Sequence, residues 1–214
     1  MLPISIPDHC FRIACLDGLV KVLATLLNTP DDWPIVDDMK GDGDGWAAAP
    51  NGGAVWGKNG AAGLLLIAGD FHSASLDSCS LLMQHRAAWT NNGDTWALPG
   101  GARDSHETAA ESALRESFEE TGISAEQVEV LEAIVTAGPF EADPKRPELA
   151  GQWTYTTVIA RTVSGEALDS TANEESLELK WVRLSEVESF NLMPAFAAAW
   201  PGLKEKLKEL AAEN

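Results

Sequence analysis

Residues 99–123, with the sequence PGGARDSHETAAESALRESFEETGI, decide how this chain is interpreted. The opening Pro-Gly-Gly predicts a tight, exposed loop. Alanine, glutamate, leucine and arginine, all good helix formers, then predict a helix over residues 105–121. Asp104 or Ser105 is expected to cap the start of this helix, with Glu107 placed for a capping box. Gly122 is placed to end it as its C-terminal glycine.

The predicted helix carries three glutamates on one face. At 100° per residue from Glu107, the side chains of Glu119, Glu116 and Glu120 fall near about 120°, 180° and 220°. Like charges at this spacing destabilise a helix, and solvation alone can tolerate them. A hard divalent cation relieves the repulsion better, because Mg²⁺ and Mn²⁺ prefer carboxylate and phosphate oxygens. Arg115 is placed to hold one carboxylate by a bidentate contact. The remaining side is expected to face the core: Ala110, Ala113, Leu114, Ser117, Phe118 and Thr121.

The segment resembles the signature of the Nudix hydrolases, G-x5-E-x7-R-E-U-x-E-E-x-G-U, in which U is a bulky aliphatic residue. Ile123 satisfies the last U, whereas Ser117 departs from the pattern at the first U, which we interpret as a packing variation. The preceding TWALPGG is also similar to the strand and loop that lead into this signature. The resemblance covers about residues 61–200. Every fixed position matches at the required spacing: Gly101, Glu107, Arg115, Glu116, Glu119, Glu120 and Gly122.

This resemblance implies a fold and a metal site. The implied fold is an α/β/α sandwich around a mixed β-sheet. The implied ligands of Mg²⁺ or Mn²⁺ are Glu116, Glu119 and Glu120, with the backbone carbonyl of Gly101. Arg115 and Glu107 would order the segment through ion pairs. Water would attack a phosphorus of a diphosphate, activated by the metal and by a carboxylate base.

The general base and the substrate contacts stay open at this stage. Glu116 is one candidate for the base, and a glutamate of the later NEESLELKW segment is another: Glu174, Glu175 or Glu178. Arg86 is similar in placement to a basic residue that contacts substrate phosphates in some family members. Lys145 and Arg146, in loop 137–152, could bind a second phosphate or a ribose-linked group. Each of these charges also fits an ordinary solvated surface. Stacking on a base, or packing in the core, is open for five aromatic residues: Trp89, Trp96, Phe140, Trp153 and Tyr155.

The rest of the chain reads as strands around helices. Strand composition predicts strands at 61–69, 79–87, 95–99, 128–136, 153–163 and 177–184, with a terminal helix over 192–212 that breaks near Pro201. A stripe of apolar residues predicts a helix over 13–27, which either packs on the main domain or forms a dimer contact. Residues 28–60, rich in Pro, Gly and Asp, predict a loop or linker. We therefore expect an N-terminal extension at 1–58, containing none of the metal ligands, and a hydrolase domain at 59–214.

Composition limits the partners. The formal charge of −18 argues against nucleic acid polymers and anionic membranes. A small phosphorylated substrate remains compatible with it when divalent cations bridge the two. No apolar run is long enough to span a membrane. The three cysteines include no CxxC pair, which predicts free thiols in the cytoplasm rather than a disulfide framework.

Three functions compete within these limits. The first is hydrolysis of a nucleoside triphosphate or a modified one. The second is hydrolysis of ADP-ribose or a nucleotide sugar, weakly indicated by Pro139, sixteen residues after the signature. The third is a catalytically silent ligand sensor. Sensors of this kind commonly lose signature glutamates, and this chain retains them all.

Overall fold

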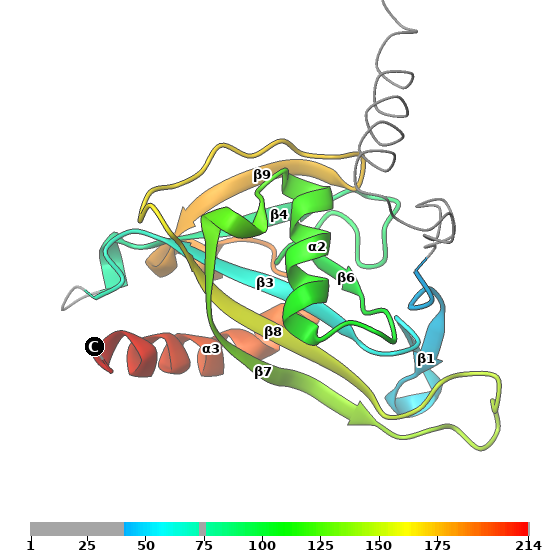
Figure 1. The fold of residues 1–214 in the computed structure, drawn as a ribbon. Coiled ribbons are helices and arrows are strands. Elements are labelled where there is room, and N and C mark those ends of the chain that lie inside the picture. The colour runs from blue at the N-terminus through cyan, green and yellow to red at the C-terminus, as the bar shows by residue number, and fades with distance from the viewer. Residues whose placement is uncertain (1–40, 73–75, 214) are drawn as a thin grey trace, which may run out of the picture. The chain divides into compact units, whose positions relative to one another are not determined.

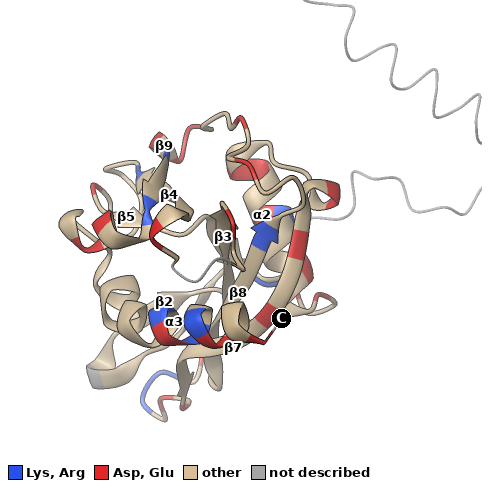
Figure 2. Cartoon of the chain, turned by 90° about the vertical axis from the view of Figure 1, so that its left-hand side faces the viewer, with Lys and Arg blue, Asp and Glu red and all other residues tan. Residues whose placement is uncertain are grey.

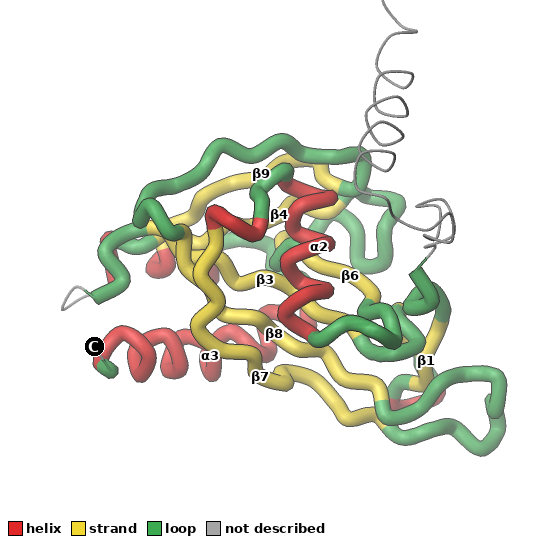
Figure 3. The backbone as a smooth tube through the Cα atoms, viewed as in Figure 1, coloured by secondary structure: helices red, strands yellow, loops and turns green. Residues whose placement is uncertain are grey.

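A computed structural model describes residues 41–72 and 76–213. These residues belong to one compact unit that begins at Gly41. A seven-stranded mixed sheet lies at its centre, with helix α2 (Ala109–Thr121) on one face and helix α3 (Pro194–Ala212) on the other (Figures 1 and 3). The predicted sandwich is thereby confirmed. The predicted helix at 13–27 lies outside the described residues. No described helix has the length and apolar character needed to cross a membrane.

Strand β3 is the centre of the sheet. It pairs in parallel with β8 and antiparallel with β4 and β6. Strand β4 continues the sheet to β5 and β9, and β8 continues it to β7. The strands are β3 (Ala61–Ala68), β4 (Ser80–Arg86), β5 (Trp96–Ala97), β6 (Gly100–Ala102), β7 (Val128–Phe140), β8 (Trp153–Thr162) and β9 (Ser176–Arg183).

The two faces of the sheet build two separate cores. Every residue of β3 is buried, and successive side chains point to opposite faces. Leu64 and Leu66 pack in the cluster that contains Ala113 of α2. Leu65 and Ile67 pack in the cluster that contains Trp200 and its neighbours from α3. Burial on both faces explains why this strand has a continuous apolar sequence.

Helix α3 runs without interruption through Pro201, so the predicted break there is wrong. Trp200 and Leu203, on either side of this proline, are almost fully buried. Their packing against the sheet stabilises the helix although Pro201 cannot donate a backbone hydrogen bond. Four short 3-10 helices complete the described helices: η2 (Pro50–Gly52), η3 (Leu76–Ser78), η4 (Ala125–Gln127) and η5 (Leu184–Ser189).

Residues 46–56 form a hairpin where the sequence predicted only a loop. Strands β1 (Trp46–Ala48) and β2 (Ala54–Trp56) pair antiparallel. The amide of Ala48 donates to the carbonyl of Ala150 at 2.7 Å, and the Trp153 indole donates to the Trp56 carbonyl at 3.0 Å. The compact unit therefore begins earlier than the boundary expected at residue 59. Three-residue strands are too short to show a hydrophobic period.

Helix α2 begins later than predicted, and its buried face differs from the predicted one by a rotation about the helix axis. Its N-cap is Thr108, whose hydroxyl accepts from the Glu111 amide at 3.2 Å, rather than Asp104 or Ser105. Gly122 ends the helix in the left-handed conformation, as expected. Phe118, assigned to the core, is 54% exposed. The buried stripe is shifted toward the glutamates and consists of Ser112, Ala113, Ser117, Glu120 and Thr121.

Candidate active site

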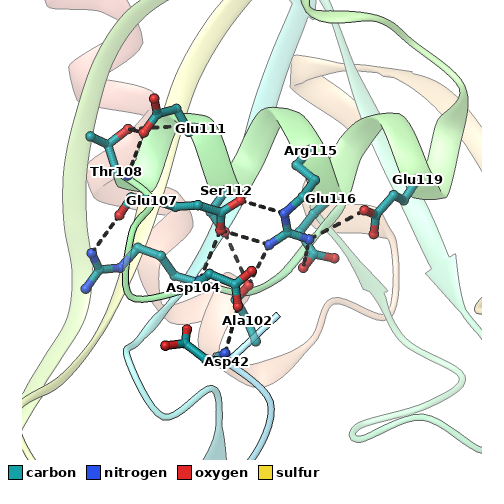
Figure 4. Close-up of polar contacts among 12 residues, drawn as sticks. Asp42, Ala102, Asp104, Glu107, Thr108, Glu111, Ser112, Arg115, Glu116 and Glu119 are labelled. Carbon is teal, nitrogen blue, oxygen red and sulfur yellow. Dashed lines mark hydrogen bonds and ion pairs between the residues drawn. The ribbon is translucent and has the colours of Figure 1, made fainter. Parts of the chain in front are cut away.

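Arg115 lies at the centre of an ion-pair network on α2 (Figure 4). Its guanidinium contacts both carboxylate oxygens of Glu107, at 2.6 and 3.0 Å. It also donates to Glu116 Oε1 at 2.8 Å and to the Ala102 carbonyl at 3.0 Å. The hydrogen bond with Glu107 is the main cause that raises the pKa of Arg115 above its usual value. The network therefore ties the helix to the loop before it, through the contacts expected of Arg115 and Glu107.

Glu116 lies directly against Gly101. A Cβ atom on Gly101 would stand 2.5 Å from Glu116 Oε2, so a side chain at this position would displace the Glu116 carboxylate. Burial, as the largest cause, raises the pKa of Glu116 to about 7, against the opposing effect of Arg115. The lack of a side chain at Gly101 thus allows the glutamate to reach the strand β6 backbone.

Glu120 is held from two sides, although the sequence placed it on a solvent-facing arc. It is only 3% exposed. The Gly100 amide donates to its Oε2 at 2.7 Å, and the Gln84 side chain donates to its Oε1 at 2.9 Å. Burial again raises the pKa, to about 7. Glu119 differs from both: its side chain is 53% exposed and lies 3.6 Å from Arg115 Nη1.

A second acidic group lies at the loop before α2. Potential ligand atoms of Asp104, His106 and Glu107 lie within 4.8 Å of one another, a spacing that the Glu116, Glu119 and Glu120 side chains do not reach in the described structure. However, Asp104 Oδ1 already accepts from the Gly43 amide at 2.7 Å, and both oxygens of Glu107 are engaged by Arg115. We interpret Asp104, His106 and Glu107 as structural residues, because Asp104 and Glu107 are engaged by Gly43 and Arg115.

The donor set of the three helix glutamates fits a hard divalent cation. Carboxylate oxygens are the ligands that Mg²⁺ and Mn²⁺ prefer. Beside Glu120, the buried Gln84 Oε1 has no hydrogen-bond partner among the described residues. A buried acceptor without a partner is costly and is consistent with a hydrated ion bound nearby. The residues present therefore fit the predicted metal.

The later glutamates are placed differently from one another. The negative charge of Glu175 is among the causes that raise the pKa of both Glu116 and Glu120. The Glu175 carbonyl accepts from the Ala87 amide at 2.8 Å, which holds this residue beside the end of β4. Glu178 pairs opposite His85 in the β4 and β9 ladder, and Glu174 lies in the turn before β9. Glu175 is thus the later glutamate brought toward the helix carboxylates.

The predicted substrate cations fall into two places. Arg86 ends β4, and its Nε donates to the Asn91 carbonyl at 3.3 Å. Burial is the largest cause that raises the pKa of Tyr155, and the charges of Glu120, Arg86 and Glu116 also act on that pKa. Arg146 instead contacts Asp143 at 2.9 Å and donates to the Gly53 carbonyl at 2.7 Å. The structure ties Arg146 to the hairpin, and its role toward substrate, like that of Lys145, stays a prediction.

The aromatic candidates separate clearly by burial. Trp96 is buried and stacks on His85 with ring centroids 4.8 Å apart. Trp153 and Phe140 stack on each other and pack, with Tyr155, in a small third core. Trp89 is 69% exposed and lies on the loop after Arg86. Among these five candidates Trp89 is therefore the one with a largely exposed ring, and its stacking on a nucleobase stays a prediction.

Gln84 is a site residue that our sequence analysis missed. It contacts Glu120 from a strand 36 positions earlier in the chain. The available signal was a polar residue inside the apolar run CSLLMQHRA. Asp42 was missed for a different reason. Its carboxylate accepts from the Ser105 amide and hydroxyl at 2.7 and 2.6 Å, within a segment that was assigned to a linker.

Comparison with known proteins agrees with this geometry. The family model of the NUDIX domain matches residues 57–202. A protein of Mycobacterium tuberculosis named "Putative 8-oxo-dGTP diphosphatase 3" is 48% identical over 168 residues, covering 78% of this chain and 72% of that protein. A nucleoside triphosphate pyrophosphatase/Nudix hydrolase fusion protein of Bifidobacterium longum is 39% identical over 83% of this chain and 34% of its own length.

A solved structure supports the same assignment. RenU, a Nudix hydrolase from M. smegmatis, is 44% identical and superposes with a TM-score of 0.68, over 80% of this chain and 99% of RenU. A bifunctional NMN adenylyltransferase/ADP ribose pyrophosphatase from Francisella tularensis is 19% identical with a TM-score of 0.52, in a comparison that covers 91% of this chain and 48% of that one, and this similarity concerns the fold alone. With every fixed position of the signature present and the domain matched, this chain belongs to the Nudix hydrolase family.

Proposed function

We propose that this protein hydrolyses the diphosphate linkage of a nucleoside triphosphate, with base-modified triphosphates as its preferred class. The observation that carries the proposal is the set of three helix glutamates, two of them held against the Gly100–Gly101 backbone. The preference for modified bases is supported by the name of the 48% identical relative. The products would be a nucleoside monophosphate and pyrophosphate.

Glu116, Glu119 and Glu120, with the backbone carbonyl of Gly101, would hold Mg²⁺ or Mn²⁺. Such an ion, when bound, lowers the pKa of water and neutralises charge on the phosphates. Arg115 supports this set from within the helix, because it fixes Glu116 at 2.8 Å while Glu107 holds the guanidinium itself. The glutamates are thereby kept in place before substrate arrives, which reduces the ordering required on binding.

We assign the general base to Glu175. It lies close enough to act electrostatically on Glu116 and Glu120, and it stands on a different element from the metal ligands. A base that is not itself a ligand keeps a free lone pair to accept the proton of the attacking water. Glu116 is the alternative base. Glu175→Gln should then lower kcat strongly and leave metal affinity unchanged, whereas a base at Glu116 predicts little effect of Glu175→Gln.

Arg86 and Trp89 would contact the two ends of the substrate. Arg86, whose charge acts on the pKa of Tyr155 as do those of Glu120 and Glu116, would offer a guanidinium to phosphate oxygens. Trp89 offers an exposed indole three residues later, and aromatic side chains stack on any nucleobase. A loop that carries both groups is able to join recognition of phosphate to recognition of the base.

The test is a substrate panel measured with Mg²⁺ and with Mn²⁺. It contains dGTP, 8-oxo-dGTP, ADP-ribose and a nucleotide sugar, and the readout separates pyrophosphate from monophosphate release. We expect the highest kcat/KM for a triphosphate with a modified base, with pyrophosphate as co-product. A higher kcat/KM for ADP-ribose would overturn the substrate class but not the metal-dependent chemistry. Absence of turnover on every compound would support the silent sensor.

A further inference from the structure

Gln84 is a buried polar residue in the middle of the sheet. It has no exposed surface and lies on β4 between Met83, which is buried, and His85. Leu82, two residues earlier, packs in the core beneath α2, so Gln84 points to the same face of the sheet. An uncharged amide in such a position costs free energy unless its hydrogen bonds are made. The contacts of the Gln84 amide should therefore account for a polar residue at this position.

Both N–H groups of the Gln84 amide are used. One donates to Glu120 Oε1 at 2.9 Å and the other to Ser176 Oγ at 2.8 Å. An ionised carboxylate only accepts hydrogen bonds, so contact with Glu120 fixes which end of the amide faces the helix. Gln84 thus joins three elements: the strand β4, the metal-binding face of α2 and the start of β9.

A β-bulge brings Ser176 to this position. The ladder between β4 and β9 pairs His85 with Glu178 and then Arg86 with Ser176, which skips Leu177. Bulges re-aim side chains and are frequent beside active sites. As a result Leu177 is 57% exposed, and a hydroxyl rather than an aliphatic chain meets the Gln84 amide. The same bulge follows directly on Glu175, the assigned base.

The remaining oxygen of Gln84 has no partner among the described residues, although it is buried. A buried acceptor without a partner costs free energy, and its retention points to a donor in the functional state. Water molecules that coordinate a divalent ion are donors of this kind, since they carry their hydrogens outward. This unpartnered oxygen is an observation additional to the two bonds, on the same amide that contacts Glu120.

We propose that Gln84 is a positioning residue for the metal site, holding Glu120 in its ligating orientation and linking it through Ser176 to the loop of Glu175. The inference rests on the proposed metal-dependent function. Gln84 touches neither the phosphates nor the attacking water in this assignment and acts through Glu120. Outer-shell partners of this type typically change metal affinity by roughly 10- to 100-fold when they are removed.

The test is Mn²⁺ binding to the substrate-free protein, measured by calorimetric titration. Gln84→Met keeps the length and volume of the side chain but removes both donors. We expect the dissociation constant for Mn²⁺ to rise roughly 10- to 100-fold. Gln152→Met is the matched control, because Gln152 also donates to a glutamate, Glu141, at 2.6 Å but in an exposed loop. That variant should leave Mn²⁺ affinity unchanged.

A double-mutant cycle separates positioning from a general effect on the fold. If Gln84 acts through Glu120, then Gln84→Met should add little to the loss caused by Glu120→Gln. Full additivity of the two losses would overturn the proposal, and so would an unchanged dissociation constant in Gln84→Met. Ser176→Ala, which removes the bond from Gln84 to Ser176 and the bond from Ser176 to Asn173 but leaves the bond to Glu120, should give a smaller rise than Gln84→Met.

Thermal unfolding in EDTA shows whether each variant folds. If Gln84→Met does not fold, Gln84→Asn takes its place, because it keeps a buried amide with a reach one methylene shorter, and the same loss of affinity is expected. Absence of Mn²⁺ binding by the unaltered protein would overturn the metal-dependent function and this proposal together. A normal Mn²⁺ affinity in the Gln84 variant that folds would overturn the proposal alone.

Discussion

At the scale of single residues, the site depends on close approach between helix carboxylates and a glycine loop. Glu116 packs where a side chain on Gly101 would be, and Glu120 accepts the Gly100 amide. Both contacts bury carboxylates, which raises the pKa of each to about 7. A cation in the site favours the ionised form of both groups, which opposes that cost. The glycines thus shape the proposed metal site although they carry no functional group.

Gly101→Ala tests this close approach. The added Cβ would stand 2.5 Å from the Glu116 carboxylate, so the glutamate must move away. We expect kcat/KM to fall by at least roughly 100-fold, as misplacement of a site group by about 1 Å commonly costs. Gly202→Ala is the control, since nothing lies within 4 Å of a Cβ at Gly202 in α3. It should keep full activity, and an equal loss in both variants would contradict the account.

Glu120→Gln tests the assignment of the metal ligands. It removes a ligand charge while retaining an acceptor, and we expect turnover to fall by at least about 100-fold. The fold should survive, because burial already disfavours the charged carboxylate. Glu205→Gln, at an exposed position of α3, is the control. Kinetics in Mg²⁺ and circular dichroism check both points, and full activity in excess EDTA would exclude metal-dependent hydrolysis.

At the scale of elements, Lys145 and Arg146 in the loop between β7 and β8 have different contacts, although the sequence suggested the same role for both. Arg146 is held by Asp143 and by the carbonyl of Gly53, whereas the described contact of Lys145 is its backbone amide with Asp143. The Arg146 guanidinium therefore fastens the loop to the turn of the hairpin. The Lys145 ammonium is the better candidate for a substrate contact.

Lys145→Ala and Arg146→Ala should consequently differ. Loss of a phosphate contact at Lys145 should raise KM for the best substrate by up to about tenfold with little change in kcat, the pattern of lost uniform binding. Arg146→Ala should lower the unfolding midpoint, since it frees the loop from the hairpin. Steady-state kinetics and thermal unfolding of both single variants provide the comparison. A large fall in kcat at unchanged KM in Lys145→Ala would mean that this loop acts on the transition state.

At the scale of the whole molecule, the described unit is joined by segments far apart in the chain. Asp42 accepts from Ser105, and the Gly43 amide donates to Asp104, so residues 41–43 fasten the loop that leads into α2. The hairpin β1 and β2 covers Trp153 from the same segment. Acidic side chains are spread over several elements, while α3 carries both signs (Figure 2). The catalytic helix is therefore supported by residues that precede the family signature.

Two truncated proteins test this dependence. A 41–214 fragment retains the hairpin and the hydrogen bonds of residues 41–43 to the loop before α2, and we expect it to keep Mn²⁺ affinity and activity. A 59–214 fragment loses both. Exposure of the Trp153 side chain alone would lower the free energy of unfolding by about 2 kcal/mol. Its unfolding midpoint should then fall by roughly 4–8 °C relative to the longer fragment. Equal midpoints and equal Mn²⁺ affinity would show that neither the stability nor the metal site depends on residues 41–58.

Much of the fold followed from local patterns. The apolar run at β3, the β-branched composition of β8 and the glycine at the end of α2 each predicted an element that the structure contains. The cap of α2 was misplaced by several residues because Asp104 and Thr108 both suit an N-cap. Packing resolved this choice, since Asp104 is occupied by the Gly43 amide. Local propensity does not include a hydrogen-bond partner such as Gly43, which lies 61 positions from Asp104.

The arc of glutamates on α2 followed from the order of residues alone. Side-chain directions in a helix follow from its constant turn per residue, so spacing along the chain is enough to place Glu116 and Glu120 together. The contacts of Gln84 with Glu120 and with Ser176 became visible only in the folded chain. These contacts depend on strand register and on the bulge opposite Arg86. Register is set by hydrogen bonds between segments distant in sequence, and a shift of one residue would turn each side chain to the other face.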